Sequence, residues 1–320
     1  MSTTANRPRR SSVARRSIAR HPVAAFLLIA LPAVMTVMTI PAMAAYDVIP
    51  GKHLPRRVGL DLEETASLFL VIVLISTVLT VTRLVDGPAG VRILLRRMTR
   101  WQVPLRWWLI AVAAMPAGTI ALAVLLGDEP HLPTLGTLLS EVVAVLVAFT
   151  LANLGEEGTW TGFMQTRLES RHNFFLVAFV TAVPFAIVHL PLRVITKEAT
   201  NAGELLGSFV VLVMFGLFFR TLIGTVARGA ANSVLLAAVT HTFFNRSNNA
   251  DGLAADVLAG PNQQSAATLT AVFLTVTLAV ANRRQLTKTY RHELDAAEET
   301  TLAASTDDRN QPVHQQGSTS

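Results

Sequence analysis

The sequence predicts an all-α, polytopic membrane protein with about eight transmembrane helices. Hydrophobic residues make up 51% of the 320 residues and charged residues only 15%, whereas soluble domains carry about 25% charged residues. A bilayer core is spanned by roughly 20 consecutive apolar residues in a helix. Apolar runs of about this kind occur eight times, at 23–45, 65–82, 105–127, 135–167, 173–192, 204–225, 229–245 and 264–282.

Some of these runs differ from a simple span. The first follows several arginines and ends in Ala42-Met43-Ala44, as a signal peptide does. Its apolar stretch is longer than the roughly 7–15 residues of a signal core, so we expect an uncleaved helix. Run 135–167 is too long for one plain crossing, whereas run 229–245 is short. Pro116 predicts a kink in the third run.

The distribution of Lys and Arg predicts the orientation, because cytoplasmic segments are enriched in these residues. With eight crossings and the amino terminus inside, 21 of the 27 Lys and Arg lie on the cytoplasmic side and six lie outside. The inner set counts Arg167, Arg171, Arg220 and Arg228 at the inner ends of their runs. We therefore expect a multi-pass protein of the cell membrane with both termini in the cytoplasm.

The composition also excludes several kinds of chemistry. The chain has no cysteine, which excludes disulfides, thiolate nucleophiles and Cys-ligated metals. The net charge of +6 does not indicate a nucleic-acid partner, because the arginines flank apolar runs and set orientation there. The expected partner is instead the lipid bilayer, and the oligomeric state is not predicted.

Ionisable residues inside the apolar runs indicate a candidate site, because they are costly in hydrocarbon and functional by default. Only His189 and His241 among the histidines lie well within runs, and only Glu141, Glu156 and Glu157 among the acidic residues. Counted from the inner ends of three helices, Glu156, His189 and His241 lie at similar depths of roughly 17–25 Å. Glu141 is expected near the outer interface and is given no role.

Helical spacing adds further residues to this set, because residues three, four or seven apart share a helix face. Four groups follow: Asn153 with Glu156 and Trp160, Glu157 with Thr161, His241 with Asn245, and Phe185 with His189. Pro191 follows His189 closely, so we expect it to break that helix and free backbone carbonyls near the site.

These side chains allow two mechanisms. The sequence has no H-E-x-x-H zinc helix and no G-x-S-x-G serine motif. A buried carboxylate can act as a general base that activates water, while imidazole and carboxamide N–H groups bind the developing oxyanion. Alternatively, two histidines and a glutamate can hold a zinc ion with one position open for water.

Three short motifs occur in order on successive polar-bearing runs. They read Glu156-Glu157-Gly-Thr-Trp-Thr-Gly162-Phe163, Phe185-Ala-Ile-Val-His189-Leu-Pro and His241-Thr-Phe-Phe-Asn245. In order and spacing they resemble the motifs of the CAAX-protease and bacteriocin-processing family, also called Abi, of intramembrane endopeptidases. The resemblance covers about 135–246 and implies a helical membrane fold with an intramembrane cavity open to the cytoplasmic side.

The resemblance also implies a function and a role for each motif residue. The expected reaction is hydrolysis of a peptide bond near the membrane, in a prenylated-type carboxyl terminus, a leader peptide or a small membrane protein. Glu156 would activate the water with help from His189, and His241 and Asn245 would form the oxyanion site. The supporting residues would be Glu157, Trp160, Thr161 and Phe185.

One position departs from the family pattern. Many members carry Arg five residues after the first glutamate, where this chain has Thr161. The departure leaves open how Glu157 is neutralised or how a substrate carboxylate is held, because Arg167 lies two turns further along.

We expect no required cofactor. Glu156, His189 and His241 come from three helices and lack the local i, i+4 ligand pair of helical zinc sites. Zinc on these three residues stays the alternative. A catalytically silent scaffold or immunity-type protein of the same fold is the second candidate function, and a transporter ranks last because no inverted repeat is evident.

The expected organisation has five segments. They are a disordered basic cytoplasmic tail at 1–21, transmembrane helices 1–3 at 22–134, the peptidase-type core with helices 4–7 at 135–246, the last transmembrane helix at 247–283, and a disordered polar tail at 284–320.

Overall fold

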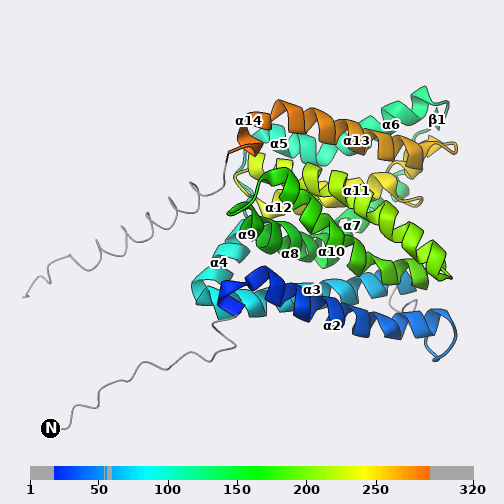
Figure 1. The fold of residues 1–320 in the computed structure, drawn as a ribbon. Coiled ribbons are helices and arrows are strands. Elements are labelled where there is room, and N and C mark those ends of the chain that lie inside the picture. The colour runs from blue at the N-terminus through cyan, green and yellow to red at the C-terminus, as the bar shows by residue number, and fades with distance from the viewer. Residues whose placement is uncertain (1–17, 54, 56–59, 289–320) are drawn as a thin grey trace, which may run out of the picture.

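The computed structural model describes residues 18–53, 55 and 60–288, which form a bundle of helices (Figure 1). Strand structure in this part is limited to β1 Glu129–Pro130 and β2 Leu258–Ala259, which pair antiparallel. The all-α prediction is therefore confirmed. Most of the two tails that we expect to be disordered lies outside the described residues.

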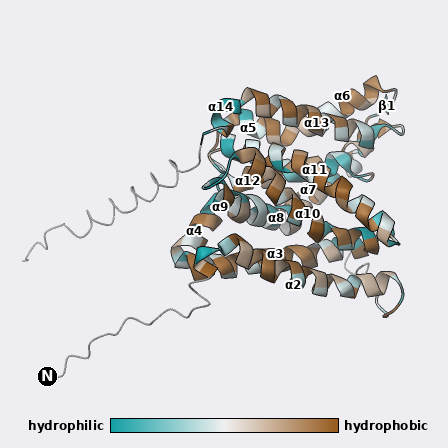
Figure 2. Cartoon of the chain, in the orientation of Figure 1, coloured by the Kyte–Doolittle hydropathy of each residue, from teal (hydrophilic) through white to brown (hydrophobic). Residues whose placement is uncertain are grey.

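Six helices of the described residues are long and apolar enough to cross a membrane. They are α2 Pro22–Ala45, α3 Leu62–Val85, the run Leu105–Leu125, α10 Phe174–Ile195, α11 Ala202–Gly229 and α13 Gln263–Ala281. Figure 2 shows hydrophobic residues along these helices and hydrophilic residues mainly near the helix ends. The chain is a multi-pass membrane protein, and the predicted number of eight crossings is approximate.

The two remaining predicted spans are helical but unusual, and both carry site residues. Run 135–167 is one helical path that ends at Glu169 and contains two π-helical turns. Its parts are α7 Leu135–Ala148, the π-turn Phe149–Asn153, α8 Leu154–Thr159, the π-turn Trp160–Gln165 and α9 Thr166–Glu169. The second is the 15-residue helix α12 Val234–Asn248. Since π-turns widen a helix locally and often mark functional sites, α8 stands out between its two turns.

A third π-helical turn occurs in the run Leu105–Leu125. This run consists of α5 Leu105–Leu109, the π-turn Ile110–Ala114 and α6 Met115–Leu125, so the turn ends two residues before Pro116. Further short elements of the described residues are α4 Gly87–Met98, the 3₁₀ turn Ala255–Val257 and α14 Arg283–Leu286.

Side-chain caps determine where the site helices begin. Asn173, Asn201 and Ser233 each accept a hydrogen bond from a backbone N–H three residues ahead, at the starts of α10, α11 and α12. Such a cap satisfies a backbone donor that the helix leaves unpaired and contributes about 1 kcal/mol. Contrary to our expectation, Pro191 does not break α10, which continues to Ile195.

Two arginines, Arg97 in α4 and Arg100 just after it, hold the turn before α12. Ala231 and Asn232 have left-handed φ angles of 53° and 60°, which L-residues adopt only at some cost. Arg97 donates from Nε to the Asn232 carbonyl and from Nη1 to the Gly162 carbonyl, both at 3.0 Å. Arg100 Nη1 donates to the Ala231 carbonyl at 2.5 Å. The start of α12 is thereby fixed against the helix that carries the first motif.

The first helix is packed into the bundle through the first motif. Phe26 is fully buried, and its ring centroid lies 6.2 Å from Trp160 and 5.4 Å from Phe163. Glycines allow α3 to approach α8 closely, because a Cβ at Gly155 would lie 2.5 Å from a Val71 methyl group. The start of α2 and helix α14 lie at the same end of the bundle (Figure 1).

Candidate functional site

A fully buried ion pair forms the centre of the candidate site. The side chains of Glu157 on α8 and Arg220 on α11 are both 0% exposed. Arg220 donates from Nη2 to Oε1 at 2.5 Å and from Nη1 to Oε2 at 3.1 Å. Both guanidinium NH₂ groups thus engage the carboxylate, the geometry that makes such pairs strong and directional.

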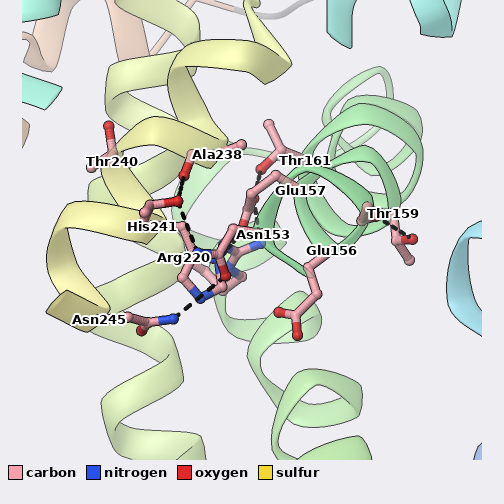
Figure 3. Close-up of polar contacts among 12 residues, drawn as sticks. Asn153, Glu156, Glu157, Thr159, Thr161, Arg220, Ala238, Thr240, His241 and Asn245 are labelled. Carbon is pink, nitrogen blue, oxygen red and sulfur yellow. Dashed lines mark hydrogen bonds and ion pairs between the residues drawn. The ribbon is translucent and has the colours of Figure 1, made fainter. Parts of the chain in front are cut away.

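Two further side chains complete the shell of the Glu157 carboxylate (Figure 3). Thr161 donates its hydroxyl to Oε2 at 2.6 Å, as the i, i+4 spacing predicts. His241 on α12 places Nδ1 2.9 Å from Oε1. Because an ionised carboxylate only accepts hydrogen bonds, Nδ1 carries the proton and donates it. Glu157 therefore joins α8, α11 and α12 at one point.

Arg220 is the residue that the sequence analysis placed wrongly. It was counted at the inner end of its run, but it lies inside α11 with its guanidinium carbon 5.2 Å from the ring centroids of both Phe185 and Phe219. Its position within the apolar run 204–225 was the available signal, since charged residues inside such runs are functional candidates whatever their sign. The search for acidic residues and histidines alone missed it.

Glu156 points away from this cluster (Figure 3). Its Oε1 lies 3.9 Å from Nε2 of His189, and its Oε2 has no hydrogen-bond partner among the described residues. The residue is only 6% exposed. A buried carboxylate oxygen without a partner is costly, so this one calls for an explanation such as a water molecule or a substrate.

The orientation of His189 suits such a water molecule. Its Nδ1 lies 2.7 Å from the carbonyl oxygen of Phe185, one helical turn earlier, and its ring packs 4.3 Å from the Phe185 ring. A carbonyl only accepts, so Nδ1 carries a proton, and in the neutral imidazole Nε2 presents a lone pair towards Glu156. The 3.9 Å between Nε2 and Oε1 exceeds a direct hydrogen bond but allows one water to bridge the two atoms.

Asn245 lies on the face of α12 that carries His241, and it reaches the turn before α8. Its Nδ2 donates to Oδ1 of Asn153 at 3.4 Å, and Asn153 in turn donates to the hydroxyl of Thr242 at 2.8 Å. Asn153 therefore contacts α12 rather than Glu156, with which it shares a helix face. Trp160 supports the site by packing against Phe185, with 5.9 Å between the two ring centroids.

Six residues at the site thus form two neighbouring units. The "charged unit" consists of Glu157, Thr161, Arg220 and His241. The "water unit" consists of Glu156 and His189. Hollows of about 250 and 450 Å³ lie away from both units, lined among others by Lys52 and Lys197 and by Arg96 and Arg100 respectively. The predicted cavity at the site stays a prediction.

Two other charged residues are held elsewhere. Arg167 pairs with Asp86 and lies over the Phe163 ring, so it does not substitute for an arginine at position 161. Glu141, to which the sequence analysis gave no role, is buried and receives hydrogen bonds from Arg246 at 2.8 and 2.5 Å. This pair connects α7 to the C-terminal end of α12.

The residues named for zinc do not fit a metal as they are placed. His241 directs Nδ1 to Glu157 in the charged unit, whereas His189 faces Glu156 in the water unit. Within the part of the chain that the structure describes, no three His, Asp or Glu side chains come together in a way that could hold a metal ion. No step below is routed through a metal.

Comparison with known families agrees with this geometry. The family model described as type II CAAX prenyl endopeptidase Rce1-like matches residues 138–247. A comparison with curated proteins found no match. The matched segment contains both units, Arg220 included, and the family predicted from the three motifs is confirmed. Residues 138–247 therefore belong to the CAAX-protease and bacteriocin-processing family of membrane proteases.

Proposed function

We propose that the chain is an intramembrane endopeptidase in which Glu156 activates a water molecule. The observation that supports this most directly is the buried Glu156 carboxylate, with one oxygen unpartnered among the described residues and the other 3.9 Å from Nε2 of His189. A carboxylate in such an environment can take a proton from water, and an adjacent imidazole positions that water. The glutamate mechanism is preferred because the candidate zinc ligands belong to separate units.

The reaction proceeds in two steps. Glu156 takes a proton from the water held with His189, while the water oxygen forms a bond to the peptide carbonyl carbon. The oxyanion that results receives hydrogen bonds from His241 and Asn245. Glu156 then returns the proton to the amide nitrogen as the carbon–nitrogen bond breaks, which releases an amine and a carboxylic acid and regenerates the carboxylate.

The charged unit determines how His241 can help. Its Nδ1 proton is committed to Glu157, so it donates to an oxyanion from Nε2 only as the imidazolium. The Glu157 carboxylate beside it stabilises that cation electrostatically. Asn245 uses one N–H on Asn153 and keeps a second for the oxyanion.

The proposed substrate is a peptide segment at the membrane. The matched family model is described as a prenyl endopeptidase, so a prenylated carboxyl terminus is the first candidate, followed by a leader peptide and a small membrane protein. The protein is proposed to act in the cell membrane with both termini cytoplasmic. The bias of Lys and Arg and the location of α14 and the start of α2 at one end of the bundle support this orientation.

The test uses the purified chain in lipid nanodiscs and three internally quenched probes. They are an S-farnesyl peptide ending in Cys-aliphatic-aliphatic-X, the same peptide without farnesyl, and a hydrophobic leader-type peptide. We expect cleavage of at least one probe by the unmodified chain and none by Glu156→Ala, His189→Ala or His241→Ala variants that remain inserted. No cleavage by the unmodified chain, or equal cleavage by the variants, would instead favour the silent scaffold.

A further inference from the structure

We propose that Arg220 is the positioning residue of the site and that positions 161 and 220 are two alternative places for one positive charge. The inference deepens the proposed function, because it concerns the same site. The resemblance of the motifs leads to the expectation of an arginine at position 161. The structure has Thr161 there and supplies the guanidinium from another helix.

Among the described residues, Arg220 donates hydrogen bonds to one group, the Glu157 carboxylate. Both of its NH₂ nitrogens contact Glu157, and the guanidinium packs against both the Phe185 and Phe219 rings, which provide favourable cation–π contact. Its Nε has no hydrogen-bond partner among the described residues. The side chain is thus directed entirely at the carboxylate that orients His241.

Position 161 can reach the same carboxylate. Thr161 lies four residues after Glu157 and already donates to Oε2 at 2.6 Å. Residues with this spacing are neighbours on a helix, so an arginine at 161 would extend along α8 towards Glu157. In the present chain Thr161 fills one acceptor site of the carboxylate, and Arg220 supplies the charge that a threonine lacks.

The consequence is a defined chain of contacts from Arg220 to the reaction. Arg220 keeps Glu157 charged and fixed, and Glu157 holds Nδ1 of His241 at 2.9 Å. Without Arg220, Glu157 has no positive partner of fixed charge in its shell, and the His241 ring loses its orientation. Arg220 makes no hydrogen bond or ion pair to Glu156 or His189 and approaches them only through the Phe185 ring, so we expect the Glu156–His189 pair to change little.

An exchange experiment tests this inference with matched variants. Arg220→Thr removes the charge, and Thr161→Arg combined with Arg220→Thr restores it from the other helix. Thr161→Gln combined with Arg220→Thr is the uncharged control of similar length. Arg228→Gln removes the other buried arginine near the end of α11, which pairs with Glu169 and not with Glu157. Each variant is assayed for kcat and KM on the cleaved probe and for its melting temperature.

We expect Arg220→Thr to lower kcat by about 100-fold with little change in KM, as loss of an oxyanion donor does. It should also lower the melting temperature by about 8 °C, because a buried carboxylate loses its partner. Relative to Arg220→Thr, the exchange variant should raise kcat by at least about tenfold and recover half of the decrease in melting temperature. Arg228→Gln should lower the melting temperature but leave kcat within about threefold, because it lies outside the charged unit.

Two results would overturn the inference. One is an Arg220→Thr variant as active and as stable as the unmodified chain. The other is an exchange variant no better than its glutamine control in either measurement. If the unmodified chain cleaves no probe, the proposed function fails separately, and the melting temperatures alone decide whether position 161 can take over the charge from Arg220.

Discussion

Glu156 on α8 and His189 on α10 face each other with 3.9 Å between Oε1 and Nε2, which is too far for a hydrogen bond and close enough to share one water. The adjacent residues Glu156 and Glu157 have different environments. Among the described residues no Lys or Arg contacts the first, whereas the second is enclosed by Arg220, Thr161 and His241. The proposed mechanism depends on this difference.

Replacement of His189 should impair catalysis without unfolding the protein. Its only hydrogen bond given by the described residues is the one to the Phe185 carbonyl, so His189→Gln removes little stabilising contact. We expect kcat to fall by about 100- to 1,000-fold, as for loss of a general acid–base partner, with a melting temperature within about 2 °C. His172→Gln, an exposed histidine outside the site, is the control and should keep full activity. Similar losses in both variants would contradict a specific role of His189.

Two glycines of α11 should respond in opposite ways to alanine. A Cβ at Gly229 would lie 1.8 Å from the buried Trp107 ring, so Gly229→Ala must displace that ring and should cost about 1–3 kcal/mol. Gly207 has nothing within 4 Å of the added carbon, and Gly207→Ala should stabilise the helix by up to about 1 kcal/mol. Thermal unfolding of both variants in the same detergent checks the prediction. Equal shifts would show that the approach of Trp107 to α11 is not close.

The lack of cysteine permits a direct test of orientation. Single cysteines at His172 and Thr287 mark the end of the bundle that carries α9 and α14, and one at Ala202 marks the opposite end; all three positions are exposed. A membrane-impermeant maleimide added to intact cells should label Ala202→Cys alone, and permeabilisation should expose the other two. Labelling of Thr287→Cys in intact cells would contradict the cytoplasmic carboxyl terminus.

Metal removal should leave the activity intact. Nε2 of His189 faces Glu156 whereas Nδ1 of His241 faces Glu157, so the candidate ligands do not converge. Dialysis against a strong chelator, followed by elemental analysis of the protein, should give a metal-depleted sample with unchanged kcat. A loss of activity that added zinc restores would show that the glutamate mechanism is wrong and that the ligands rearrange.

The sequence could predict the fold and most of the candidate site because both follow from patterns local in the chain. Apolar runs indicate the spans, and Glu156, His189 and His241 are conspicuous as ionisable residues inside them. Thr161 was correctly grouped with Glu157 since i, i+4 spacing on one helix is a local property.

What could not be predicted depends on contacts between distant segments. Arg220 reaches Glu157 across 63 positions of sequence, and no spacing rule connects them. Helical spacing places Glu156 and Glu157 on different faces, but it does not show that α10 packs against the first and α11 and α12 against the second. Pro191 was expected to break α10, but the helix continues because a proline removes one hydrogen bond that the packed bundle can do without.

The central claim is that Glu156 supplies the base while Glu157 supplies structure, and the two glutamine variants separate these roles. Cleavage rate and melting temperature are measured for Glu156→Gln and Glu157→Gln in the same nanodiscs. We predict that Glu156→Gln loses at least about 1,000-fold in kcat and keeps its melting temperature. Glu157→Gln should lose stability by about 3–5 kcal/mol, because Arg220 is left buried without its partner. A Glu156→Gln variant that still cleaves at more than about a tenth of the normal rate would contradict the account.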